Sequence, residues 1–123
     1  MRKKILLVDD SATVVMMEKM ILSKENYDLV IARNGREAVE RALAEKPDLV
    51  LMDLVMPEMN GLEAVKAIRA SGNGVASVPI IMVTTRGEEE NIEAGYESGC
   101  TDYITKPFNT VELLTKLRSI LAE

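Results

Sequence analysis

The sequence contains no histidine, no tryptophan and a single cysteine among its 123 residues. One cysteine excludes an intrachain disulfide and a cysteine-rich zinc site, and the lack of histidine excludes histidine-ligated metals and a Ser-His-Asp triad. Aromatic residues make up 3% of the chain, which leaves no stacking platform for single-stranded nucleic acid. No apolar run approaches the roughly 18 residues of a membrane span, and the apolar run near the start is too short for a signal peptide. Any chemistry must therefore use carboxylates, hydroxyls and lysine.

Basic residues are also scarce relative to acids, with 15 lysines and arginines against 20 aspartates and glutamates. The net charge of −5 makes the chain a poor candidate for neutralising phosphates, so we expect no direct nucleic-acid partner and no membrane partner. The length suits one domain with its own core. We expect a single domain over residues 1–123 with no output domain, since no linker or repeat interrupts the pattern.

Five short apolar runs alternate with segments of helical periodicity. Nearly continuous apolar runs are typical of strands buried on both faces, and their alternation with helices indicates βαβ units. Right-handed crossovers then predict an α/β fold, a doubly wound (βα)5 domain whose five-stranded parallel sheet has helices on both faces. The expected strands are 5–8, 29–32, 49–52, 78–83 and 102–105, and the expected helices are 11–24, 36–45, 62–70, 88–98 and 110–121.

Polar side chains stand where several of these strands end. Asp9 and Asp10 follow the first run and Asp53 follows the third, and ligands bind beyond the carboxyl ends of strands in open α/β sheets. Two carboxylates ~4 Å apart repel by about 4 kcal/mol at an effective dielectric near 20, so three at one place require cations. Lys106, at the end of the fifth run, supplies one charge, and a hard divalent ion such as Mg²⁺ suits the rest. Taken singly, such an acid is better explained as part of a helix N-terminus, with Asp10 or Ser11 as the N-cap.

A carboxylate beside a divalent ion is suited to attack phosphorus, with a lysine and a hydroxyl such as Thr84 contacting the transferred oxygens. No residue suggests a catalytic base that would release the product quickly. The pattern therefore favours a phospho-aspartate that persists, which describes a switch better than a turnover enzyme.

These residues lie in four stretches that together resemble a response-regulator receiver domain of two-component signalling, over essentially the whole chain. The stretches are 5–11 (ILLVDDS), 48–61 (DLVLMDLVMPEMNG), 83–84 (VT) and 99–108 (GCTDYITKPF). The resemblance implies a flavodoxin-like sheet in the order 2-1-3-4-5 and a phosphoacceptor domain that is not an enzyme.

The resemblance also implies a role for each matching position. Asp53 is the expected phosphoacceptor, Thr84 the hydroxyl that moves to the phosphoryl group, Lys106 its counter-charge, and Tyr103 the switch aromatic. The expected Mg²⁺ ligands are Asp9, Asp10, Asp53 and the backbone carbonyl of Val55. The positions expected to flank the phosphoryl group are Val55, Thr85 and Arg86, and the bond before Pro107 is expected to be cis.

The expected partners follow from the same resemblance. A sensor histidine kinase or phosphotransfer protein would donate the phosphoryl group in the cytoplasm. A protein target would read the switch through 88–98, 102–105 and 110–121, as in stand-alone chemotaxis or motility regulators or in a phosphorelay. We expect a monomer or a homodimer promoted by phosphorylation.

Three alternatives use the same residues differently. A degenerate receiver would be a binding module that needs no phosphorylation. A haloacid-dehalogenase phosphatase requires a second acid where Val55 stands, and a flavodoxin requires a phosphate-cradling loop where Asp9 and Asp10 stand.

Two further expectations concern packing. Helical spacing places Val14, Met17 and Ile21 against the sheet and leaves Ala12, Val15 and Met16 outside around Lys19, as a face for docking the kinase. Cys100 is expected to be a buried structural thiol.

Overall fold

Five strands and five α-helices alternate in the computed structural model, which describes residues 2–54, 56, 59–72, 74–85, 89–106 and 109–121, without the side chains of 85 and 89–91. The strands are β1 (Lys4–Val8), β2 (Asp28–Ala32), β3 (Leu49–Asp53), β4 (Ile80–Thr85) and β5 (Asp102–Lys106). The helices are α1 (Ala12–Leu22), α2 (Gly35–Glu45), α3 (Gly61–Arg69), α4 (Glu89–Ser98) and α5 (Thr110–Leu121), and a 3₁₀ turn, η1 (Ser23–Glu25), follows α1.

The strands form one parallel sheet in the order β2-β1-β3-β4-β5, which confirms the predicted doubly wound fold. The register pairs Val8 of β1 with Met52 of β3, so the residues that follow these two positions lie side by side. On the other side of β3, Asp53 pairs with Val83 of β4. The carboxyl ends of the three central strands therefore reach the same edge of the sheet.

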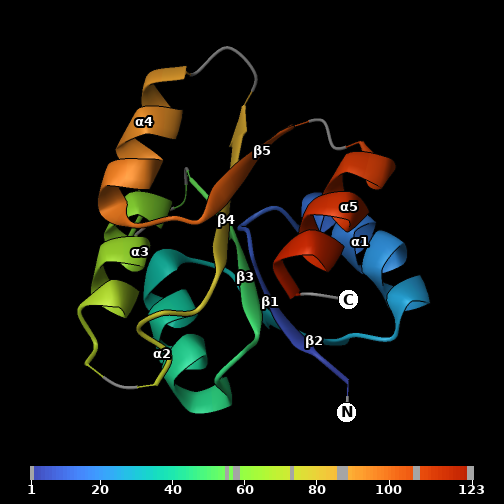
Figure 1. Ribbon diagram of the computed structural model, residues 1–123, viewed down its shortest axis with the longest axis horizontal. Coiled ribbons are helices and arrows are strands. Elements are labelled where there is room, and N and C mark those ends of the chain that lie inside the picture. The colour runs from blue at the N-terminus through green and yellow to red at the C-terminus, as the bar shows by residue number, and fades with distance from the viewer. Residues whose placement is uncertain are drawn as a thin grey trace.

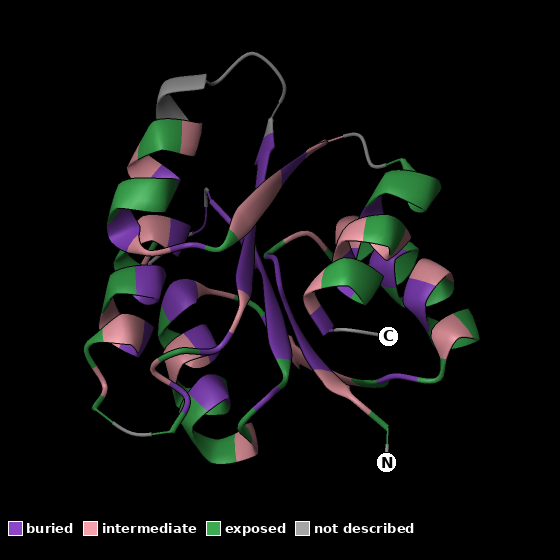
Figure 2. Ribbon diagram, in the orientation of Figure 1, coloured by how far each residue is buried: buried purple, intermediate pink, exposed green. Residues whose placement is uncertain are grey.

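Each strand divides its side chains between two apolar layers, because successive residues point to opposite faces of the sheet. One layer, with Leu6, Val50 and Met82, packs against α2 and α3, and the other, with Leu7 and its neighbours, packs against α1 and α5. Figure 1 shows α2, α3 and α4 on one side of the sheet and α1 and α5 on the other. In Figure 2 the central strands are buried and the exposed residues lie on the outer helical faces.

Polar side chains fix where the helices begin. The Oγ of Ser11 accepts a hydrogen bond from the backbone N–H of Val14, which caps α1. Asn60 and Glu63 form a reciprocal capping box at the start of α3, with distances of 3.0 and 3.1 Å. Such caps satisfy N–H groups that have no partner within the helix. They hold the helices that follow β1 and β3 next to the carboxyl ends of those strands.

The predicted inner face of α1 is only partly right, because Ile21 is half-buried and packs against the core but Met17 is exposed. Val15, Glu18 and Leu22 are the buried residues of this helix, whereas Met17 is 44% exposed. The helix is apolar on almost every side, so helical periodicity alone favours no single face. The burial of Val15 also removes it from the surface that we expected to dock a kinase.

Arg69, at the end of α3, connects three separate segments. Its guanidinium donates hydrogen bonds to the carbonyls of Gly99, Ala76 and Val78 over 2.7–2.9 Å. Burial lowers the pKa of Arg69, with the neighbouring Cys100 acting in the opposite direction. We call this set of contacts the Arg69 clamp. Cys100 itself is buried, as predicted, and burial raises the pKa of its thiol to about 11.

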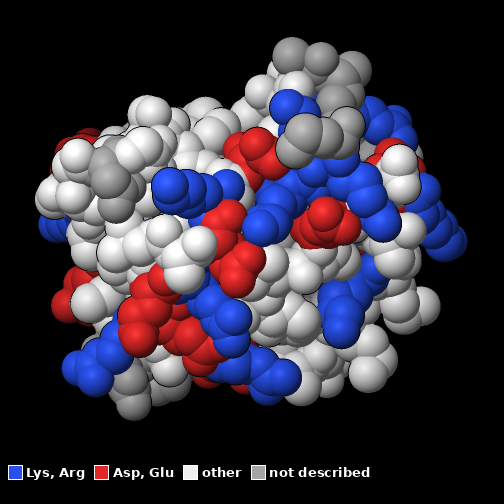
Figure 3. All heavy atoms as spheres, turned by 90° about the horizontal axis from the view of Figure 1, so that it is seen from below, with Lys and Arg blue, Asp and Glu red and all other residues white. Residues whose placement is uncertain are grey.

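The surface carries charges of both signs. Viewed from below, acidic and basic side chains adjoin one another (Figure 3). Lys4 pairs with Glu45 at 3.1 Å and Arg2 with Asp28 at 3.4 Å. Among the described residues, no helix combines the length and the apolar character that crossing a membrane requires.

Gly61 is the point at which α3 approaches the end of β3 most closely. A Cβ added there would lie 2.3 Å from the backbone oxygen of Asp53 and 2.9 Å from the Cα of Leu54. These neighbours are backbone atoms, so a larger residue would have to displace the end of β3 itself.

We expect Gly61→Ala to lower the free energy of unfolding by about 1–3 kcal/mol, because overpacking at backbone forces the chain to shift. Gly74→Ala is the matched control, since nothing lies within 4 Å of its added Cβ, and it should change stability by less than about 0.5 kcal/mol. Urea unfolding measures both variants. Equal stabilities for the two would contradict this account of the contact.

Candidate functional site

Three aspartates meet at the carboxyl edge of the sheet, as predicted. Asp9 directly follows β1, Asp10 comes next, and Asp53 is the last residue of β3. One carboxylate oxygen from each lies within 4.8 Å of the other two. Asp9 and Asp53 are buried and Asp10 is exposed. The parallel pairing of β1 with β3 causes this convergence, because it brings both strand ends to the same level.

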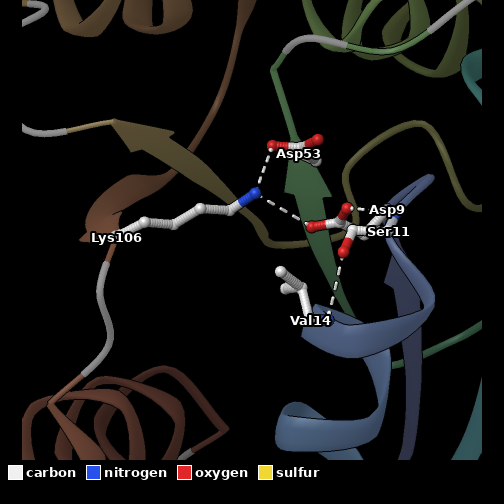
Figure 4. Close-up of polar contacts among 5 residues, drawn as sticks. All are labelled: Asp9, Ser11, Val14, Asp53 and Lys106. Carbon is white, nitrogen blue, oxygen red and sulfur yellow. Dashed lines mark hydrogen bonds and ion pairs between the residues drawn. The ribbon is translucent and has the colours of Figure 1, made fainter.

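Lys106 contacts two of these acids from the edge strand β5. It ends β5, and its long side chain reaches past β4 to place Nζ 3.1 Å from Asp9 and 3.1 Å from Asp53 (Figure 4). The side chain of Lys106 is partly exposed, whereas both acids are almost completely covered. Lys106 therefore lies beside the expected acceptor, and its predicted role as the counter-charge of the phosphoryl group stays a prediction.

Asp9 is further held by the backbone that follows it. Its Oδ1 accepts a hydrogen bond of 2.9 Å from the N–H of Ser11, while its Oδ2 faces Lys106 (Figure 4). Ser11 in turn caps α1. The same short turn therefore orients the Asp9 carboxylate and starts the first helix.

The electrostatics of the site show an excess of negative charge. Burial and the neighbouring Asp9 raise the pKa of Asp53 to about 6, although Lys106 acts in the opposite direction. Burial would lower the pKa of Lys106, but Asp53 and Asp9 outweigh it and raise the pKa above its ordinary value. Among the described residues, the Lys106 ammonium therefore does not balance the three carboxylates, and the site favours a further cation.

Thr84 lies on β4 between the strands that carry Asp53 and Lys106. It is buried, and its Oγ1 has no hydrogen-bond partner among the described residues. A buried hydroxyl without a partner costs free energy, typically about 1–3 kcal/mol.

Tyr103 lies elsewhere, on β5 between α4 and α5. Its ring packs edge-on against that of Tyr96, with centroids 6.2 Å apart, and the Nζ of Lys116 lies 5.4 Å from its centroid. Lys116 also pairs with Asp102 at 3.1 Å. The structure thus places Tyr103 in an aromatic and ionic cluster beside α4, and its predicted switch role stays a prediction.

Several predicted positions lie outside the described residues. These are Val55, with its carbonyl ligand and flanking role, Arg86, and Pro107 with its cis bond. Thr85 is described only as backbone at the end of β4. The three aspartates, Thr84, Lys106 and Tyr103 are the predicted site residues whose side chains the structure places.

Sequence reasoning missed Glu18. It lies on the inner face of α1, is 1% exposed, and its Oε1 has no hydrogen-bond partner among the described residues. Burial, together with the charges of Asp9 and Asp53, raises the pKa of Glu18 to about 8, and Lys106 opposes the shift. The acid is therefore mostly protonated at pH 7. Glu18 is three residues after Val15 and four before Leu22, so all three share one helical face, and this spacing was the signal in the sequence that could have found it.

With the geometry described, comparison with known proteins identifies the class. The family model described as "Response regulator receiver domain" matches residues 5–118. The chain therefore belongs to the response-regulator receiver family of two-component systems. The phosphatase and flavodoxin alternatives are discarded on this finding.

The chain is similar to longer regulators. It is 42% identical over 118 residues to the transcriptional regulatory protein ResD of Bacillus subtilis, covering 96% of this chain and 48% of ResD. It is 38% identical over 121 residues to the DNA-binding response regulator MtrA of Mycobacterium tuberculosis, covering 98% of this chain and 51% of MtrA. The chain spans about half the length of the curated relatives it matches.

Solved structures share the fold throughout. A putative response regulator from Chloroflexus aurantiacus has a TM-score of 0.93 and 31% identity, with both chains fully covered. The receiver domain of the sensor histidine kinase PA1611 from Pseudomonas aeruginosa has a TM-score of 0.91 and 28% identity, again with full coverage. That structure has a magnesium ion coordinated in its active site cleft.

These relatives correct one prediction. We expected no direct nucleic-acid partner, and this expectation is wrong, because relatives such as MtrA are DNA-binding response regulators. The error arose from reading a partner from the charge of these 123 residues alone, whereas about half of each such relative lies outside the matched region. The predicted absence of an output domain is not tested by these comparisons and stays a prediction.

The buried Glu18 predicts how the free energy of unfolding depends on pH. The folded pKa of about 8 exceeds the ordinary value of 4.5, so the folded state holds an extra proton between these two values. The Glu18 contribution is complete below about pH 4.5 and is lost as pH rises through 8, by at most about 1.4 kcal/mol per pH unit.

We therefore expect Glu18→Gln to lose this part of the pH dependence, and Glu18→Leu to be more stable than wild type at pH 9. Urea titrations from pH 5 to pH 9 measure both effects. Glu40→Gln, on the exposed side of α2, should keep the wild-type profile. An unchanged slope in Glu18→Gln would show that the carboxyl does not titrate in this range.

Proposed function

We propose that this protein accepts a phosphoryl group on Asp53 from a phosphohistidine of a sensor kinase or phosphotransfer protein, in a Mg²⁺-dependent reaction. One observation carries the proposal. The Asp53 carboxylate lies within 4.8 Å of two further carboxylates and 3.1 Å from the Lys106 ammonium, at the carboxyl edge of a receiver fold.

The transfer balances as follows. A lone pair of an Asp53 oxygen forms the new O–P bond while the P–N bond to the donor imidazole breaks. The bonding pair stays on the imidazole nitrogen, which takes a proton from solvent. Negative charge spreads over the three oxygens of the moving phosphoryl group, and fixed cations nearby stabilise it.

Lys106 is positioned to supply one such cation. Its Nζ already contacts Asp53, so it needs little movement to reach an oxygen bonded to that residue. The hydroxyl of Thr84 offers a hydrogen bond that has no other partner among the described residues. Movement of Thr84 toward the phosphoryl group would shift the protein between two conformations, which is the basis of a switch.

The donor set fits Mg²⁺. Carboxylate oxygens are the ligands that this ion prefers, and Asp9, Asp10 and Asp53 present three of them within 4.8 Å. The bound ion would supply charge neutralisation and orientation at the phosphoryl oxygens. Asp9 and Asp10 would hold it, and Asp53 would share it with the incoming group.

We find no group among the described residues that is placed to activate water beside Asp53. The carboxylates at the site are engaged by Lys106 or suited to the cation, and Glu18 is mostly protonated at pH 7. The phosphorylated protein would therefore persist and act as a signal, since it would not turn over rapidly as an enzyme does.

Asp53→Asn tests the acceptor. Incubated with acetyl phosphate and Mg²⁺, wild type should gain about 80 Da, the mass of one phosphoryl group, and Asp53→Asn should gain nothing. Intact-mass spectrometry measures both. Asp28→Asn is the control, because this exposed acid lies at the opposite end of the sheet and should leave the gain unchanged. A wild type that gains no mass would favour the degenerate-receiver alternative.

A second test uses the raised pKa of Asp53. Because this pKa is about 6, roughly half of the Asp53 carboxyls carry a proton at pH 6, and cation binding must release it. We expect Mg²⁺ affinity to rise from pH 5 to pH 7 and to level off above.

Calorimetry in two buffers of different ionisation enthalpy measures the released proton. In a Glu18→Gln background, where the acid with a pKa of about 8 is removed, the release at pH 6 should approach half a proton per ion, and at pH 8 it should vanish. Asp53→Asn should bind Mg²⁺ more weakly and release no proton at either pH. Proton release that is the same at pH 6 and pH 8 would contradict the assignment.

A further inference from the structure

The short connection between β2 and α2, residues 32–35, contacts the backbone next to two of the site aspartates. At its start, the carbonyl of Ala32 accepts a hydrogen bond of 3.1 Å from the N–H of Asp9. At its end, the N–H of Gly35 donates a hydrogen bond of 2.9 Å to the carbonyl of Met59, which lies between β3 and α3. We call residues 32–35 the β2–α2 turn. This turn therefore connects the backbone of Asp9 with the chain that leaves β3.

Gly35 lies too close to Met59 for any side chain to fit between them. A Cβ added to Gly35 would lie 2.0 Å from the carbonyl oxygen of Met59 and 2.7 Å from its carbonyl carbon. Both distances are far shorter than a van der Waals contact, so a larger residue would push the start of α2 away from Met59. The φ of Gly35 lies outside the left-handed region, which among the described glycines contains Gly72 and Gly99. The position therefore requires glycine because of space, and not because of backbone conformation.

Backbone contacts continue from Met59 to Asp53. Two residues after Met59, the N–H of Gly61 donates a hydrogen bond of 2.8 Å to the carbonyl of Leu54. Gly61 is also the residue whose Cα lies close against the backbone oxygen of Asp53. The start of α2, the start of α3 and the end of β3 therefore pack backbone against backbone. Because these contacts join backbone atoms, a displacement at Gly35 is not absorbed by rotation of a side chain and moves the end of β3.

The two helices that meet here begin with the same pattern. Residues 34–37 read NGRE and residues 60–63 read NGLE. In both, the asparagine side chain accepts a hydrogen bond from the N–H of the glutamate three residues later, at 2.8 and 3.0 Å. The first N–H groups of a helix have no partner within it. The glycine N–H of each pattern therefore donates outside its own helix, to the chain around the end of β3.

We propose that Gly35 is a positioning residue for the cation site, because it holds Met59, and through it the Asp53 end of β3, at a fixed separation from Asp9. Gly35 has no side chain to offer to the ion or to the acids, so it acts through the backbone of other residues. Residues that hold metal ligands in place typically change the affinity for the metal about 10–100-fold when they are replaced. This inference rests on the function proposed for Asp53 and adds to it a residue outside the strand ends that carry the acids.

Gly35→Ala tests this proposal, and Ala42→Gly is the matched control. Ala42 is buried on the same helix, so its replacement by glycine destabilises α2 without adding an atom next to Met59. In the protein without metal, Gly35→Ala should shift the backbone amide NMR signals of Asp53 and Leu54, and Ala42→Gly should leave them in place. Signals of Asp53 and Leu54 that do not move in Gly35→Ala would overturn the proposal.

Calorimetric titration with Mg²⁺ then measures the affinity of the folded proteins. We expect Gly35→Ala to bind Mg²⁺ about tenfold more weakly than wild type, and Ala42→Gly to bind it as wild type does. An equal loss in both variants would show that Gly35 acts only through the stability of α2, and would overturn the proposal. Wild type that binds Mg²⁺ no better than Asp53→Asn would overturn the function proposed for Asp53 as well. Equal affinities of wild type and Gly35→Ala would overturn the present inference alone.

A measurement on wild type keeps the proposal testable if Gly35→Ala does not fold. Coupling between two sites is reciprocal, so if breaking the hydrogen bond from Gly35 to Met59 weakens Mg²⁺ binding about tenfold, saturating Mg²⁺ makes that breaking about tenfold rarer. Amide hydrogen exchange of Gly35 should therefore slow more than that of Thr101, whose N–H bonds to the carbonyl of Ile80 at the opposite end of the sheet. Equal slowing of the two amides, or none, would overturn the proposal.

Discussion

The site depends on an imbalance of charge that the fold imposes. Parallel pairing of β1 with β3 brings Asp9 and Asp53 to one level, and Asp10 adds a third carboxylate within 4.8 Å. A single ammonium, reaching across β4 from the end of β5, offsets part of this charge. The remaining negative charge contributes, together with burial, to the raised pKa of Asp53. The proposed binding of a divalent cation follows from this residual negative charge, because such an ion would offset it.

The fold and most of the site could be predicted from the apolar runs and from the residues that follow them. The runs mark the strands, and the residues at their ends mark the site. Runs such as 5–8 and 49–52 mark buried strands, and the residue after each run is placed at the ligand-binding edge by the parallel topology alone. That reasoning located Asp9, Asp53, Thr84 and Lys106 without coordinates. The strand order came from the family resemblance, since alternation of strands and helices fits more than one order. The contact of Lys106 with two acids at once depends on its reach across β4, which no local pattern encodes.

Two of the failures concern α1. Helix α1 is apolar almost all round, so its periodicity favoured no face, and the prediction chose Val14, Met17 and Ile21 over the residues that are buried. Glu18 lies on the same helix and was missed because a charged residue is expected to face solvent unless tertiary packing overrides that preference. The prediction about nucleic acid failed for another reason. The charge of a domain limits what that domain itself binds, but it does not limit what a longer protein binds, and the relatives are longer proteins.

The Arg69 clamp has a mechanical consequence for the helix beyond it. Three carbonyls, including that of Gly99 just after α4, are fastened to one guanidinium. The far end of that ten-residue helix lies about 15 Å away along its axis, near the end of β4. A tilt of α4 that keeps this contact would pivot at Gly99, so it would displace the first turn of the helix more than its last.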